Sequence, residues 1–363
     1  MLPQAFPYSK FLKMKEAKEK RFLQLLSGED WFVPVIQRPG VAEQYGGLCS
    51  DREKTLEFQL DFLNTYLELQ SDLIYDYLEP WHGVGIYASA FGCPLYWSKH
   101  TAPQTHPIYN TAEEIAHYRK PDIDNCEVMQ MVLETIRYFR EQTGDMLDIA
   151  LTDTQSPNDT ASLIVDTCEF FVLSRTDHEL IQPLMQDITD TMIQFTERQL
   201  EALGKTATQP GHIMISSPKL KGISLSDDNM AVLDPLSYKT TSKPYNEQLS
   251  KHFGGVAIHT CGNFAHTAET LLETEGLYMV DCAIGYAADP TPNDPAVIRQ
   301  RFAGTDILVK VRLGADELHL LEPLIDRKLK LIVDISTTGT IAEKNQQYEA
   351  AKRAIDDYVS SST

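Results

Sequence analysis

The sequence contains no apolar run long enough to cross a membrane. A transmembrane helix needs about 20 consecutive apolar residues, and no window of the chain approaches that length. The N-terminal segment also lacks the apolar core of a signal peptide, because lysines and an arginine crowd residues 10–21. We therefore expect a cytoplasmic protein that makes no contact with membranes.

Cysteine is scarce and dispersed. The six cysteines lie far apart in 363 residues, which differs from the dense pattern of a secreted disulfide scaffold. We expect reduced thiols, so a cysteine with a function would be a ligand or a nucleophile, and most cysteines would be small buried side chains.

Positive charge is also in short supply. Lys and Arg number 32 against 52 Asp and Glu, which gives a formal net charge of −20. Such a surface repels the phosphates of nucleic acids and anionic lipids. We expect a small-molecule substrate and no nucleic-acid partner.

Two common groups of motifs are missing. The glycines at 83, 85, 254 and 255 have neither P-loop nor dinucleotide-binding spacing, so nucleotide binding has no support. Gly-x-Ser-x-Gly does not occur either, which argues against a hydrolase with a nucleophile elbow.

What the chain does contain is a regular alternation of strand-like and helical segments. Short apolar segments lie at residues 31–36, 77–81, 148–152, 222–226, 255–259, 277–281, 307–311 and 329–334. Helical spacing marks residues 10–26, 54–77, 127–142, 178–203 and 235–253. Apolar strands separated by helices indicate a parallel sheet covered on both faces, and about eight such units favour a closed (β/α)8 TIM barrel. We expect one barrel domain over residues 1–363 with a helical extension over about residues 1–30.

In such a barrel the residues at the carboxyl ends of the strands form the catalytic mouth. These positions hold Glu79, Trp81, His82, Asp153, Gln155, Ser156, Asp227, Asp228, His259, Cys261, Asn263, Asp281, Cys282, Asp334 and Ser336. Turns alone would favour Gly, Pro, Asn and Asp, so the added His, Cys, Glu and Gln indicate a polar site. The alternative for each acid or amide is a cap on the following helix.

We assign candidate roles within this set. Asp228, His259 and Glu79 are the predicted catalytic residues, because carboxylates and imidazole exchange protons with a substrate. The predicted substrate-binding residues are Trp81, His82, Asp153, Gln155, Asp227, Asn263 and Asp281.

His259-Thr260-Cys261-Gly262 is the most specific element. Residues two apart on a strand point the same way, so the imidazole and thiol can converge on one ion. Zinc accepts both ligand types and commonly has three protein ligands at a catalytic site. Cys282, Asp228 or Glu79 could supply the third; without metal, the pair is a histidine base beside a thiol.

The sequence resembles the uroporphyrinogen decarboxylase superfamily, which includes the methylcobamide:coenzyme M methyltransferases. The resemblance extends over nearly the whole chain and is carried by "MKEAKEKRFLQLLSGEDWFVPVI", "GISLSDDNM", "GGVAIHTCGN" and "MVDCAIGYAADP". In the methyltransferase branch an H-x-C element binds zinc, and His259 and Cys261 match it. The resemblance therefore implies a zinc-activated thiol substrate, a corrinoid methyl donor on a partner protein, and a homodimer.

The chain departs from both branches at particular positions. The methyltransferases take a third ligand, a cysteine, from the last strand, where this chain has Asp334-Ile-Ser-Thr-Thr-Gly339; we therefore predict His259, Cys261 and Cys282 as metal ligands. The decarboxylases carry an arginine-rich element after the first strand, where this chain has only Gln37-Arg38-Pro39-Gly40. One arginine cannot neutralise the many carboxylates of a tetrapyrrole, so haem-pathway decarboxylation is not expected.

Three functions follow as hypotheses. The first is an enzyme with methyltransferase-type chemistry at His259 and Cys261. The second is a metal-free decarboxylase or lyase with Asp228 and His259 as proton donors. The third is a non-catalytic binding protein, which the many titratable groups at one mouth argue against.

Overall fold

The computed structural model describes residues 6–38 and 46–361. Pro39 and Gly40, at the predicted end of the first strand, lie outside this range. Six parallel strands form one sheet in the order β1 (Val35–Gln37), β10 (Lys330–Ser336), β9 (Leu308–Gly314), β8 (Leu277–Ala283), β7 (Val256–Thr260) and β6 (Ile223–Ser226). A second parallel pair joins β2 (Tyr77–Leu78) to β5 (Asp148–Ile149).

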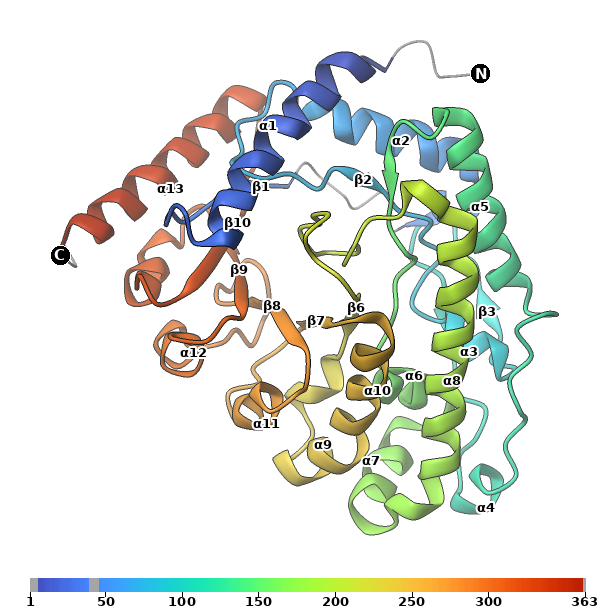
Figure 1. Cartoon of the computed structure of the whole chain (residues 1–363). Coiled ribbons are helices and arrows are strands. Elements are labelled where there is room, and N and C mark those ends of the chain that lie inside the picture. The colour runs from blue at the N-terminus through green and yellow to red at the C-terminus, as the bar shows by residue number, and fades with distance from the viewer. Residues whose placement is uncertain (1–5, 39–45, 362–363) are drawn as a thin grey trace.

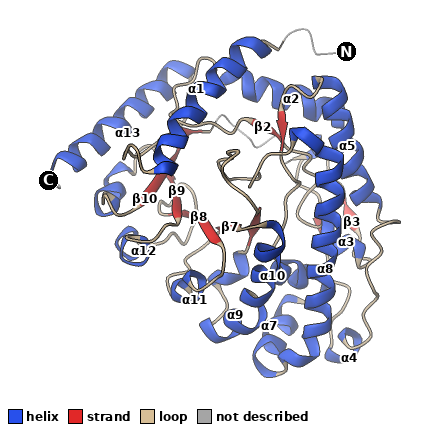
Figure 2. Ribbon diagram, in the orientation of Figure 1, coloured by secondary structure: helices blue, strands red, loops and turns tan. Residues whose placement is uncertain are grey.

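Backbone contacts connect the two sheets on both sides. The segment after β5 meets β6, where the Ser226 amide donates to the Thr154 carbonyl at 3.0 Å and Gln155 forms a parallel bridge to Ser226. The segment before β2 meets β1, where the Asp72 amide donates to the Val35 carbonyl at 2.8 Å. The eight strands therefore follow one another in chain order around a ring (Figures 1 and 2). This confirms the predicted (β/α)8 architecture.

Helices cover the outside of this ring (Figure 2). The longer ones are α1 (Tyr8–Ser27), α2 (Arg52–Thr65), α5 (Glu127–Thr143), α7 (Thr167–Thr176), α8 (His178–Leu203), α10 (Lys243–Phe253) and α13 (Ile341–Ser361). The shorter ones are α3 (Ile86–Ala90), α4 (Ala112–Ile115), α6 (Pro157–Ile164), α9 (Pro235–Thr241), α11 (Ala268–Leu272) and α12 (Pro295–Phe302). The 3-10 turns are η1 (Gly47–Ser50), η2 (Gly204–Thr206), η3 (Asp228–Ala231) and η4 (Leu318–Leu324), and the strands β3 (Leu95–Tyr96) and β4 (Gln104–Thr105) form a small hairpin. None of the helices in the described residues has an apolar stretch of membrane-spanning length.

Two predicted helices differ from the structure. The helix predicted over residues 54–77 ends at Thr65, because the apolar residues Leu69, Leu73 and Ile74 are buried from a non-helical segment that leads into β2. The helix predicted over residues 235–253 is divided at Ser242 into α9 and α10. Gly28 ends α1 as expected, with a left-handed φ of 73°.

The amino-terminal end of the barrel is filled by apolar side chains. Met214 and Ile215, on the segment between α8 and β6, belong to one buried cluster with Ala257, Met279 and Ile332 of the strands. Phe22 and Leu25 of α1 join the same cluster. The interior is therefore closed at this end, and a polar site inside the barrel can form only toward the carboxyl ends of the strands.

Candidate functional site

His259 and Asp281 lie side by side on neighbouring strands. The register pairs His259 of β7 with Asp281 of β8, and Asp281 in turn with Lys310 of β9. The His259 Nδ1 atom hydrogen-bonds the Asp281 carboxylate. That carboxylate also lies 2.5 Å from the Lys310 ammonium and 3.0 Å from Nε of Arg312.

This surrounding charge keeps the Asp281 carboxyl ionised. Burial raises the pKa of the Asp281 carboxyl, but the positive charges of Lys310 and Arg312 lower it by a larger amount. The pKa of Asp281 is therefore well below its usual range. An ionised Asp281 accepts the proton on Nδ1 of His259. The Nε2 lone pair of His259 is then free to bind a proton or a metal ion.

Cys261 and Asp228 meet this Nε2 atom. The Cys261 sulfur lies 3.4 Å from Nε2, and the nearer Asp228 oxygen lies 4.0 Å from it. The Cys261 amide donates to the same Asp228 oxygen at 2.6 Å, which holds the carboxylate over the end of β7. His259 is buried, Cys261 is half-buried, and the Asp228 side chain is 46% exposed, so the group opens to solvent on the Asp228 side.

The three side chains suit a divalent metal ion. One ligand atom of each lies within 4.8 Å of the others. Two ligands of a tetrahedral zinc, one nitrogen and one sulfur, are roughly 3.5 Å apart given normal bond lengths, close to the 3.4 Å seen here. Burial, with a smaller effect of Asp228, raises the pKa of the Cys261 thiol to about 12, and Arg312 offsets this only in part. A bound metal cation would favour the thiolate form.

The structure corrects the prediction that Cys282 is the third ligand. Successive side chains on a strand point to opposite faces, and Asp281 points to His259. Cys282 therefore points outward, where it is fully buried in the apolar core. Asp228 occupies the position that had been assigned to Cys282.

Glu79 and Asp153 belong to a second polar group, built around His212. The Glu79 carboxylate hydrogen-bonds Nδ1 of His212, and an Asp153 oxygen lies 3.4 Å from its Nε2. The Trp81 indole and the Gln155 amide donate to Asp153 at 3.1 and 3.0 Å. The structure therefore brings together four residues predicted from the ends of β2 and β5.

His212 was not predicted, because it reaches the group from the segment between α8 and β6, at the other end of the barrel. No residue pattern around it marks it as a site residue. Burial lowers its pKa, but Asp153 and Glu79 outweigh burial and raise the pKa to about 9. The imidazolium form is thus favoured at neutral pH, held between two carboxylates.

A chain of buried charges extends from Asp281 toward β1. Lys310 lies 3.2 Å from Asp334, which also accepts hydrogen bonds from the Tyr75 hydroxyl at 2.6 Å and from Arg38 at 3.1 Å. Sequence reasoning missed Arg38, Tyr75, Lys310 and Arg312. The sequence did mark Lys310 and Arg312, because these two charged residues interrupt the apolar strand at residues 308–313.

His82 does not lie at the mouth, contrary to prediction. Its Nε2 atom lies 3.1 Å from the Thr135 hydroxyl of α5. Trp81 points to Asp153 in the interior, whereas His82 points to α5 in the helix layer. Burial lowers the pKa of His82 to about 4, so this imidazole is neutral.

Asp227 and Asn263 are also tied into the structure and do not face a substrate. The Asp227 carboxylate is fully buried and accepts hydrogen bonds from Ser156, Tyr238, Ser242 and Asn246. The Asn263 side chain bonds the Pro292 carbonyl and the Ala265 amide. Both residues hold loops around the mouth. Asp281, also predicted to bind substrate, instead bonds His259, Lys310 and Arg312.

Comparison with known proteins supports the fold. Residues 51–210 match the family model described as uroporphyrinogen decarboxylase (URO-D), a stretch that includes Glu79 and Asp153 but not His259 or Cys261. Among solved structures, a methyltransferase from Methanosarcina mazei superposes with a TM-score of 0.62 at 16% sequence identity, over 94% of this chain and 98% of that one. A search of curated proteins found no match.

Proposed function

We propose that the chain is a member of the uroporphyrinogen decarboxylase superfamily and an enzyme of methyltransferase type that acts on a small substrate at the barrel mouth. The match of residues 51–210 to the uroporphyrinogen decarboxylase family model supports the first part. The observation that carries the proposal is the convergence of Nε2 of His259, Sγ of Cys261 and the Asp228 carboxylate within 4.8 Å. The likeness in fold to a methyltransferase from Methanosarcina mazei supports the reaction type.

We assign zinc to this group, held by His259, Cys261 and Asp228. A bound zinc ion would act as a Lewis acid that lowers the pKa of a substrate thiol, so that its thiolate could accept a methyl group at neutral pH. The methyl donor in this proposal is a corrinoid on a partner protein.

The residues of the chain have separate tasks in this proposal. Asp281 keeps the proton on Nδ1 of His259 and so directs Nε2 toward the ligand position. Lys310 and Arg312 keep Asp281 ionised. Glu79, Asp153 and the imidazolium of His212 present charged groups to the polar part of the substrate.

Metal analysis of the purified protein tests the assignment. We expect about one zinc per chain, lost in His259→Ala, Cys261→Ala and Asp228→Ala. Cys282→Ser is the matched control, since this thiol is buried in the core, and it should keep its zinc. A wild-type protein that binds no zinc when zinc is supplied would refute the assignment.

A metal-free lyase or decarboxylase is the second candidate. It is favoured by one observation, the proton held by His212 between Glu79 and Asp153. An imidazolium in the interior could protonate the carbanion that remains after loss of carbon dioxide. Turnover that survives chelation and metal-ligand substitution, but not His212→Asn, would favour this candidate over methyl transfer.

A further inference from the structure

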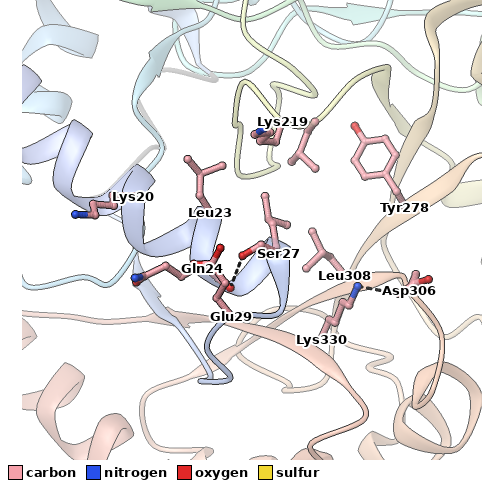
Figure 3. Close-up of a pocket in the computed structure, with 12 residues that line it drawn as sticks. Lys20, Leu23, Gln24, Ser27, Glu29, Lys219, Tyr278, Asp306, Leu308 and Lys330 are labelled. Atoms are coloured by element: carbon pink, nitrogen blue, oxygen red, sulfur yellow. Dashed lines mark hydrogen bonds and ion pairs between the residues drawn. The ribbon is translucent and has the colours of Figure 1, made fainter.

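A cavity of about 610 Å³ lies at the amino-terminal end of the barrel, on the opposite side from the candidate active site. It is lined by the C-terminal part of α1, the segment before β6 and the first residues of β8, β9 and β10 (Figure 3). Met214, Ile215 and Met279 of the buried cluster fill the barrel end behind it. A molecule in this cavity would therefore not reach His259.

The wall of the cavity is apolar. Leu23, Leu26, Leu220 and Leu308 line it, and the Tyr278 ring lies at one side (Figure 3). Leu23, Leu26 and Leu220 are only half-buried. Covering their remaining apolar surface with a ligand would be favourable. A volume of this size lies within the roughly 300–1,000 Å³ typical of small-molecule sites.

The edge of the cavity carries three lysines against two acids, Glu29 and Asp306, in a protein whose net charge is −20. Lys219 and Lys330 lie on either side of Leu308, and the Lys20 side chain extends away from the leucines (Figure 3). Lys330 pairs with Asp306 at 2.9 Å, whereas within residues 6–38 and 46–361 neither Lys20 nor Lys219 has a carboxylate at ion-pair distance. The Lys219 ammonium thus remains available to an anion in the cavity.

A buried polar atom gives independent evidence for a ligand. The Tyr278 hydroxyl is inaccessible to solvent and has no hydrogen-bond partner among the described residues. Leaving such a group unsatisfied costs about 1–3 kcal/mol. Figure 3 shows this hydroxyl on the same side of the leucines as Lys219.

We propose that this cavity binds a small amphipathic organic anion, with its apolar body against Leu23, Leu26 and Leu308 and its acidic group near Lys219 and the Tyr278 hydroxyl. The leucines contact the apolar part of the ligand. The Lys219 ammonium and the Tyr278 hydroxyl bind its acidic group. This site is separate from the proposed methyl-transfer site and does not depend on it.

Calorimetric titration of the full chain with decanoate, below its micelle concentration, tests the proposal. We expect saturable binding of about one decanoate per chain and about tenfold weaker binding in Lys219→Glu, because the mutation reverses a charge beside the head group. Lys221→Glu, an exposed lysine outside the cavity, is the matched control and should bind as the wild type does. Tyr278→Phe should also bind decanoate more weakly while remaining folded.

Decyltrimethylammonium, with the same chain and opposite charge, separates charge selection from apolar burial. We expect it to bind at least about tenfold more weakly than decanoate, by the same charge argument. Equal affinity for the two probes, an unchanged affinity in Lys219→Glu, or no saturable binding of decanoate would each overturn the proposal.

Discussion

The ammonium of Lys310 lies 2.5 Å from the carboxylate of Asp281, and both side chains are completely buried in the barrel interior. Removing one partner of a buried ion pair leaves the other charge uncompensated, which costs about 3–5 kcal/mol. We therefore expect Lys310→Met to lower the free energy of unfolding by this amount, as measured by urea denaturation. Lys239→Met breaks an exposed ion pair with Glu273 and should change the free energy of unfolding little. Equal effects of the two mutations would contradict the role assigned to Lys310.

Asp281→Asn should weaken zinc binding without removing a ligand. The amide cannot hold the proton on Nδ1 of His259 as the ionised carboxylate does, so Nε2 is no longer fixed as the metal-binding atom. Loss of such a supporting group typically lowers metal affinity by about 10–100-fold. Competition with a chromogenic chelator measures the change, and Asp306→Asn, at an exposed position, serves as control. An unchanged affinity in Asp281→Asn would show that His259 is oriented by other contacts.

His212 should make stability depend on pH in the alkaline range. Its pKa is raised from 6.5 to about 9 in the folded protein. The stabilisation is therefore fully present below pH 6.5 and is lost as the pH rises through about 9. A shift of this size corresponds to a contribution on the order of 3 kcal/mol.

Unfolding free energies measured between pH 6 and pH 10 should therefore fall more steeply for the wild type than for His212→Asn. His252→Asn alters a largely exposed histidine paired with Glu197 and should retain the wild-type slope. If the slopes of wild type and His212→Asn coincide, the imidazole is not charged between its two carboxylates.

The strands were predictable because each is an apolar run buried on both faces. All eight runs became barrel strands, from β1 at residues 35–37 to β10 at residues 330–336. The helix predicted over residues 54–77 was too long for a related reason. Leu69 and Leu73 are apolar because they are buried, and burial alone does not distinguish a helix from an extended segment.

The candidate site was partly predictable for a geometric reason. Residues at adjacent strand ends meet in a barrel, which brings His259 to Asp281 and Asp228. The prediction that Cys282 is a metal ligand was wrong because this residue follows Asp281 directly. Two consecutive strand residues cannot both face the interior. His212 could not be predicted, since its position depends on how a long loop folds into the barrel.

Asp227 and Asp228 are adjacent in sequence, yet the structure predicts opposite effects of mutating them. The Asp227 carboxylate is completely buried and accepts four hydrogen bonds. Asp227→Ala leaves those buried donors unpaired, which should lower the free energy of unfolding by about 3 kcal/mol or more. Asp228 is largely exposed, so Asp228→Ala should cost little stability but should remove the third zinc ligand.

Thermal unfolding and zinc content of both variants test this contrast. Asp227→Ala, studied well below its melting temperature, should retain zinc because His259, Cys261 and Asp228 are unchanged. Asp228→Ala should melt near the wild-type temperature and lose zinc. If Asp228→Ala holds zinc as tightly as the wild type, the carboxylate is not a ligand. The 4.0 Å separation between its oxygen and Nε2 of His259 would then reflect only the bond from Asp228 to the Cys261 amide.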